Sequence, residues 1–106
     1  MIKVSVFYPN RPGAKFDMAY YLSSHMPMVK RTIGSAVKSM AVDEGVGLVD
    51  QADPAAAPKY LAIGHLLFDS VDAFQQAFAA HGAPIIADVP NYTNIQPVIQ
   101  INEVRM

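Results

Sequence analysis

The residues FDMAYYLSSHMPMVKRTIG, Phe16 to Gly34, have the pattern of an amphipathic helix. At about 100° per residue, one arc of this helix is almost wholly apolar, and its opposite side is polar. Such a helix is expected to pack on a sheet, so the patterns that flank it decide the fold. The arc carries Met18, Tyr21, Leu22, His25, Met26, Met28, Val29 and Ile33, whereas the polar side carries Ser23, Ser24, Lys30 and Arg31.

Two residues of this helix are unusual. His25 lies inside the apolar arc, where a group that titrates near neutral pH faces the expected core. Pro27 follows it, and a proline within a helix removes a backbone hydrogen bond at a cost of about 3 kcal/mol. We therefore expect either a kink just after His25 or a helix that ends there and restarts.

The flanking patterns predict four strands and a second helix. Ile2–Tyr8 alternates strictly, Ala36–Val49 is a strand interrupted by Gly45 and Gly47, and Lys59–Asp69 is apolar on both faces, which is typical of a central strand. Ser70 is a suitable N-cap for a helix that runs to about His81 and ends at Gly82, where His81 complements the helix dipole. A short helical turn and a loop precede the last strand, Ile95–Val104, and Pro97 places the start of this strand at a sheet edge or bulge.

The order strand, helix, strand, strand, helix, strand predicts an α+β fold of the ferredoxin-like βαββαβ type, with a four-stranded antiparallel sheet and both helices on one face. We expect one domain across residues 1–106. The other sheet face needs a cover, because apolar residues make up 52% of the chain and charged residues only 16%. A homodimer in which two sheets meet face to face provides that cover.

The composition also excludes several classes of function. The net charge is −1 and the cations are scattered, so no surface for nucleic acid is predicted. The chain has no cysteine, which excludes a disulfide scaffold and a cysteine nucleophile. No signal peptide or bilayer-spanning run is recognisable, so we expect a cytoplasmic protein with no membrane partner.

Three segments resemble the EthD family of dimeric α/β-barrel proteins: YYLSSHMP (Tyr20–Pro27), AAHGAPIIADVPNYTNIQP (Ala79–Pro97) and QINEVR (Gln100–Arg105). The resemblance implies a ferredoxin-like monomer that pairs into a barrel-like dimer. It also implies that His25 is the histidine of the family's helix. The family is named for a pathway that degrades ethyl tert-butyl ether, and similar barrels include cofactor-free monooxygenases, isomerases, dehydratases and decarboxylases. Some relatives of this barrel bind haem, so haem ligation by His25 is an alternative.

The candidate catalytic residues are His25, Tyr21 and His65. His25 has a reference pKa that suits a general acid or base at neutral pH, and Tyr21 lies one turn earlier, where its hydroxyl can donate to an oxyanion. A packed core residue is the alternative for both. His65 faces either the pocket or the dimer interface, because a parity error of one residue reverses the face of a strand.

The candidate substrate-binding residues lie on the helix, at the end of the first strand and in the late polar loop: Tyr8, Met18, Leu22, Met28, Asn91 and Tyr92. A packing role is the alternative for Tyr8, and simple turn chemistry is the alternative for the loop. No metal site is predicted, because the three histidines lack ligand spacing and no carboxylate is in register with His25. No nucleotide-binding motif is present, so no cofactor is predicted.

Two functions follow from these patterns. The first is a small cofactor-independent enzyme that carries out proton transfer or oxidation on a hydrophobic, aromatic or polyketide-like metabolite, with His25 as general acid/base. It would be a monooxygenase-like oxidoreductase, an isomerase or a lyase. The second is a non-enzymatic module that binds a hydrophobic ligand or supports an oxygenase in ether degradation. In a third interpretation, His25 is only a core residue and the dimer itself is the function.

Overall fold

The computed structural model describes all 106 residues and contains one four-stranded sheet. Its strands are β1 (Ile2–Pro9), β2 (Ser39–Glu44), β3 (Tyr60–Phe68) and β4 (Val98–Glu103). The order across the sheet is β2-β3-β1-β4, and all neighbouring strands are antiparallel. The apolar strand β3 is therefore central, as predicted, and β4, which begins directly after Pro97, is an edge strand.

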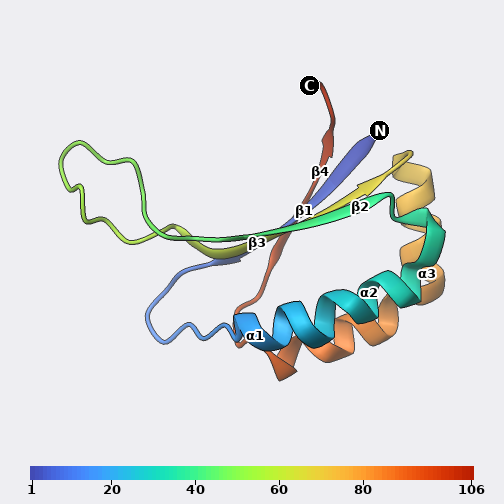
Figure 1. Cartoon of the computed structure of the whole chain (residues 1–106), viewed down its shortest axis with the longest axis horizontal. Helices are drawn as coiled ribbons and strands as arrows, with labels where there is room; N and C mark the ends of the chain where they lie inside the picture. The colour runs from blue at the N-terminus through green and yellow to red at the C-terminus, as the bar shows by residue number, and fades with distance from the viewer.

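The helices lie on one face of this sheet (Figure 1). The first helical segment comprises α1 (Met18–Tyr20), a π-helical turn (Tyr21–His25) and α2 (Met26–Ile33), and a 3-10 turn (Gly34–Ala36) follows it. The second is α3 (Val71–Asp88), extended by a 3-10 turn at Val89–Asn91. The element order confirms the predicted α+β, ferredoxin-like architecture.

Pro27 neither ends the helix nor restarts it. The helix continues through a wider π-helical turn, in which the Met26 N–H donates to the Tyr21 carbonyl. Pro27 then occupies the first turn of α2, where its missing N–H costs little. This wider turn also shifts the phase of the helix, so a wheel drawn at a constant angle places some side chains on the wrong face.

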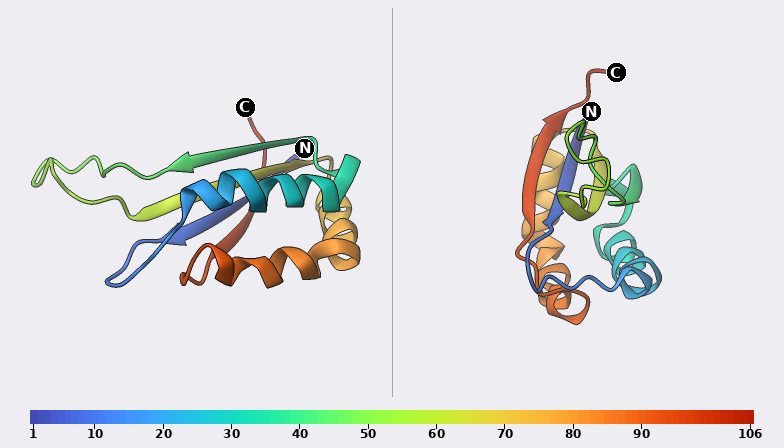
Figure 2. Two further views of the ribbon diagram at one scale, coloured as in Figure 1. Left: turned by 60° about the horizontal axis from the view of Figure 1, so that its bottom comes forward. Right: turned by 90° about the vertical axis from the view of Figure 1, so that its left-hand side faces the viewer.

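The predicted end of the second helix at Gly82 is wrong. Ser70 caps the N-terminus of α3 as expected, but the helix continues past Gly82 and Pro84 to Asp88. Gly82 is buried, and a Cβ there would lie 2.9 Å from the Phe78 ring, so this glycine serves close packing rather than helix termination. His81 is an exposed mid-helix residue and not a C-terminal one. Figure 2 shows a sharp bend in α3, and Pro84 provides its cause.

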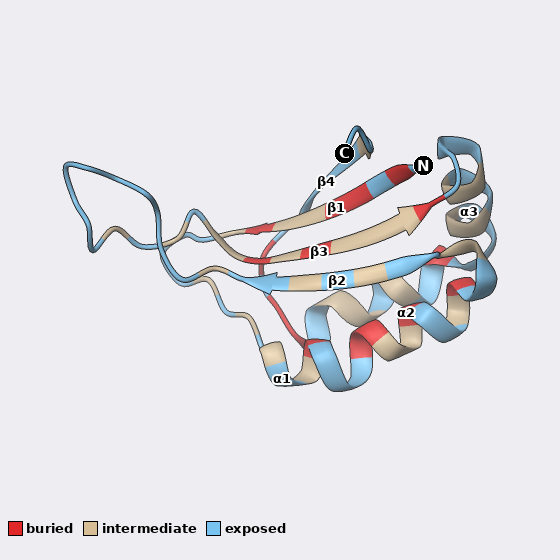
Figure 3. Cartoon of the chain, turned by 45° about the horizontal axis from the view of Figure 1, so that its top comes forward, coloured by how far each residue is buried: buried red, intermediate tan, exposed pale blue.

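The second strand is also shorter than predicted, because the chain leaves the sheet after Glu44. Residues 45–59 form a long connection that projects away from the sheet and is largely exposed (Figure 3). Gly45 begins it, and a Cβ at Gly45 would overlap the Tyr60 carbonyl. Strands β2 and β3 therefore separate at a position where only glycine fits.

The core lies between the sheet and the helices. Val4, Tyr8 and Phe68 project from the sheet toward Tyr21 and Val29 of the helical segment, and all five side chains are buried. The opposite sheet face carries half-buried apolar side chains of Phe7, Ile63 and Leu67, and no helix covers it (Figure 2). None of the helices is long and apolar enough to cross a bilayer.

Candidate functional site

A cavity of about 430 Å³ lies between the sheet and the helices. This volume is within the range of small-molecule sites, and the lining is mostly apolar, as such sites usually are. It carries no Asp, Glu, Lys or Arg side chain. The lining residues are Val4, Val6, Tyr8, Tyr21, His25, Met26, Val29, Ile33, Gly64, Leu66, Phe68, Phe74, Phe78, Ile85, Ile86, Val89, Pro90, Tyr92, Gln96, Pro97 and Ile99.

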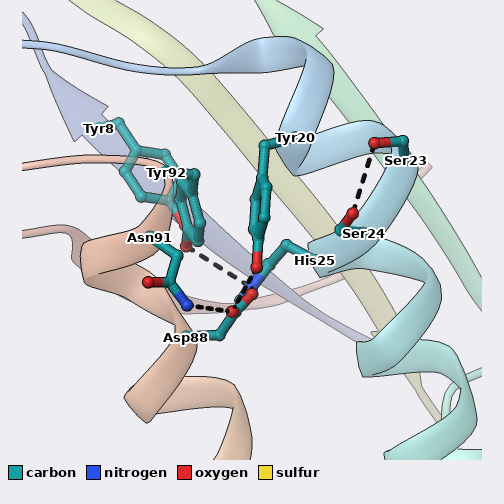
Figure 4. A network of polar contacts seen from close by, with 8 residues as sticks. All are labelled: Tyr8, Tyr20, Ser23, Ser24, His25, Asp88, Asn91 and Tyr92. Atoms are coloured by element: carbon teal, nitrogen blue, oxygen red, sulfur yellow. Dashed lines mark hydrogen bonds and ion pairs between the residues drawn. The ribbon is translucent and has the colours of Figure 1, made fainter.

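His25 lies at the end of the π-helical turn, and only 3% of its surface is exposed. Its Nδ1 atom is 2.9 Å from Asp88 Oδ2, which comes from the last turn of α3 (Figure 4). The other carboxylate oxygen, Oδ1, accepts hydrogen bonds from the Tyr20 hydroxyl at 2.7 Å and the Asn91 amide at 2.9 Å. Asp88 is thus held by three donors, and it orients the imidazole ring.

The electrostatic environment of this pair follows from burial and hydrogen bonding. Burial lowers the His25 pKa below its ordinary value, and the hydrogen bond and charge of Asp88 only partly oppose this effect. Burial alone would raise the Asp88 pKa, but the hydrogen bonds from Asn91, His25 and Tyr20 outweigh it and the pKa is lowered. At neutral pH, an ionised Asp88 therefore accepts the Nδ1 proton of a neutral His25.

This tautomer leaves His25 Nε2 as a hydrogen-bond acceptor. The Tyr92 hydroxyl lies 3.4 Å from Nε2 and 2.7 Å from the Tyr8 hydroxyl. Burial raises the pKa of Tyr8, Tyr21 and Tyr92, so their hydroxyls stay protonated and available as donors. The cavity thus contains a neutral base beside neutral hydrogen-bond donors, which is the combination that proton abstraction next to a carbonyl requires.

Backbone geometry brings these side chains together. The wider turn stacks Tyr21 on His25, with ring centroids 5.4 Å apart and planes 14° apart. Tyr92 is fixed because its carbonyl accepts a hydrogen bond from the Asp17 N–H, and the Thr93 hydroxyl donates to the Lys15 carbonyl. The polar loop after α3 is therefore tied to the start of the first helix, and it delivers Tyr92 to the cavity.

Apart from His65, the site residues predicted from the sequence fall into three groups in the structure. Four of them line the cavity: His25, Tyr21, Tyr8 and Tyr92. Asn91 does not line it, but it holds Asp88. Met18, Leu22 and Met28 lie outside the lining, and Leu22 is 52% exposed, because the π-helical turn changes the phase of the helix.

His65 lies on the sheet face away from the cavity. It pairs with Ser5 of β1 and Ala41 of β2. Its ring bonds the Ser5 hydroxyl through Nδ1 and the Asp43 carboxylate through Nε2, both at 3.0 Å. Of the two orientations left open by the strand pattern, the structure has the one away from the pocket.

Asp88 is the site residue that the sequence analysis missed. No carboxylate on the helix of His25 is in register with it, and its partner comes from 63 residues further along the chain. It was hidden because Gly82 was interpreted as the end of the second helix. An apolar stripe that continues through Ile85 and Val89 was the available signal that the helix extends to Asp88.

The sheet order and the helix-sheet cavity define a ferredoxin-like α+β protein with an internal apolar site. The EthD domain model matches residues 14–96, so the chain belongs to the EthD family. It is similar over 99% of its length to an EthD-like protein from Ralstonia eutropha JMP134, with 44% identity, 92% of that chain covered and a TM-score of 0.91. No curated protein matches the sequence.

Two more distant structures share the fold. An EthD family protein from Bacillus halodurans C-125 is 18% identical, with 99% of both chains covered and a TM-score of 0.66. A protein from Arabidopsis thaliana is 11% identical, with 100% of this chain and 97% of that chain covered and a TM-score of 0.68.

Proposed function

We propose that this protein is a cofactor-independent enzyme that transfers a proton on a hydrophobic substrate, with His25 as the general base and acid. The observation that supports this proposal is the His25–Asp88 pair at the wall of an apolar cavity. Asp88 fixes the tautomer, Nε2 takes the proton, and the Tyr92 hydroxyl donates to the oxygen on which charge develops. The same proton transfer is the step shared by isomerisation, dehydration and cofactor-independent oxidation.

The test uses hydroxy-aromatic compounds and aryl ketones, with deuterium incorporation from D2O as the readout. We expect His25→Gln to abolish incorporation while the melting temperature stays close to that of the wild type. Asp88→Asn should reduce incorporation without abolishing it, because Asp88 is a positioning residue. His81→Gln is the matched control, since His81 is exposed on α3. Ligand binding without any incorporation would instead indicate the non-enzymatic binding module.

We also propose that two copies pair through the sheet face that the helices leave uncovered. Phe7, Ile63 and Leu67 place apolar surface there, and exposed apolar surface that no helix covers commonly marks an interface. The radius of gyration of 14.6 Å exceeds the value of about 13 Å that is usual for a compact chain of this size. A molecule whose sheet has helices on only one face gains core by pairing through the other face.

A further inference from the structure

The two ends of the cavity differ in chemistry. Strand register gives its direction, because Tyr8 lies opposite Ala62 at one end of β1 and Ile2 lies opposite Phe68 at the other. The hydroxyl and imidazole groups of Tyr8, Tyr92 and His25 gather at the first end. The second end is lined by aromatic rings, with the Phe68 and Phe74 centroids 5.2 Å apart.

The cavity is elongated along β1. Val6 and Val4 follow Tyr8 on the same face of the strand, and Gly64 and Leu66 lie opposite them on β3. Tyr8 lies four residue steps along the strand from Val4, which corresponds to about 13 Å. The lining is therefore polar at the Tyr8 end and apolar along the wall that extends toward Phe78.

The charges around the cavity also restrict which ligands can bind, in addition to its shape. No cationic side chain lines the cavity, and the carboxylate of Asp88, which already has three hydrogen-bond donors, lies beside its polar end. Lys30 and Arg31 are exposed on α2 and do not line the cavity. An anionic group at the polar end would lose its hydration without gaining a cation, and Asp88 would repel it.

The geometry points to a substrate class: an uncharged, elongated molecule with a single carbonyl or hydroxyl oxygen at one end and an alkyl or aryl tail. The oxygen lies between Tyr92 and His25, and the tail extends toward Phe78. Ile86 and Ile99 are 60% and 52% exposed and line the cavity between α3 and β4, and the exposed lining residue Gln96 is neutral, so the entrance carries no charge. This inference rests on the proposed function for the role of His25, but its test needs no turnover.

The test compares the binding of para-pentylphenol, para-pentylbenzoate and pentylbenzene to the purified protein by calorimetry near neutral pH. We expect the phenol to bind at least about tenfold more tightly than the benzoate, a difference of about 1.4 kcal/mol. We expect pentylbenzene to bind more weakly than the phenol, because it has no oxygen for the polar end. Equal or tighter binding of the benzoate, or no binding of any probe to the folded protein, would overturn the inference.

Two variants test the orientation of the ligand. Phe78→Ala enlarges the far end, so the optimal alkyl chain among para-alkylphenols should lengthen. Phe7→Ala removes the same side chain from the opposite sheet face and should leave the optimum unchanged. An unchanged optimum in a folded Phe78→Ala variant would overturn the orientation. If the phenol binds with the expected selectivity but His25→Gln leaves turnover intact, only the acid/base role of His25 fails.

Discussion

The His25 Nδ1 atom donates to Asp88 Oδ2 over 2.9 Å, although 63 residues separate the two side chains. The contact joins the start of α2 to the end of α3, which run in opposite directions on the same sheet face (Figure 2). It exists only because α3 bends and continues past Pro84. The hydrogen bond that orients the His25 ring therefore depends on how the two helices pack. A change at the end of α3 is expected to alter the orientation and pKa of His25 at the start of α2.

Replacement of Asp88 by asparagine should lower the His25 pKa further. Asp88 raises this pKa by its hydrogen bond and charge, and without the charge the desolvation of His25 is less opposed. Histidine side-chain NMR during a pH titration measures the shift, and the ring nitrogens report the tautomer. Asp72→Asn, at an exposed position in the first turn of α3, is the control and should leave His25 unchanged. A His25 pKa that rises in Asp88→Asn would refute the assigned pairing.

Stability should depend on pH through His25. Because its pKa is lower in the folded state, the unfolded chain binds more protons as the pH falls below about 6.5. The His25 contribution is therefore present above that pH and is lost on acidification toward the folded-state pKa. Urea denaturation at several pH values should show a smaller decline in the free energy of unfolding between pH 7 and pH 5 for His25→Gln than for the wild type. An equal decline in both proteins would show that His25 is not desolvated.

Gly64 should be intolerant of a side chain. A Cβ at this position would overlap the Tyr21 hydroxyl, which lies against the backbone of β3. Gly64→Ala is expected to cost about 1–3 kcal/mol, the range of an overpacked core, and to displace the Tyr21 ring from its stack on His25. Gly47→Ala is the matched control, because its Cβ would meet only the Ala56 carbonyl at 3.5 Å. Equal melting temperatures for the two variants would contradict this packing.

Charge on the uncovered sheet face should prevent pairing of the chains. Phe7→Lys places a cation between the apolar side chains of Ile63 and Val98, its cross-strand neighbours, and burying it without a partner in a sheet-to-sheet interface would be unfavourable. Sedimentation should show a dimer for the wild type and a monomer for the variant. Val46→Lys, at a 93% exposed position on the long connection, should remain dimeric. A wild-type monomer at all concentrations would exclude the proposed homodimer.

The local patterns predicted the fold well because they depend on short-range physics. Alternation identified β1 and the faces of β3, and Ser70 marked the start of α3. The helix ends predicted from glycine and proline were wrong where packing overrides local propensity. Gly82 lies within α3 and fits against Phe78, and Pro27 follows a widened turn inside a continuous helix. The pairing of His25 with Asp88 depends on the tertiary docking of two helices, so no spacing in the sequence encodes it.

The central claim is that His25 is a neutral base whose Nε2 faces a ligand in the apolar cavity. The most direct measurement is a nitrogen NMR spectrum of the histidine side chains, recorded near neutral pH with and without para-pentylphenol. We predict a His25 that carries its proton on Nδ1 and whose Nε2 resonance shifts when the phenol is added, while those of His65 and His81 do not. A His25 that carries its proton on Nε2, or whose resonances are unchanged at a saturating concentration of bound phenol, would contradict the account.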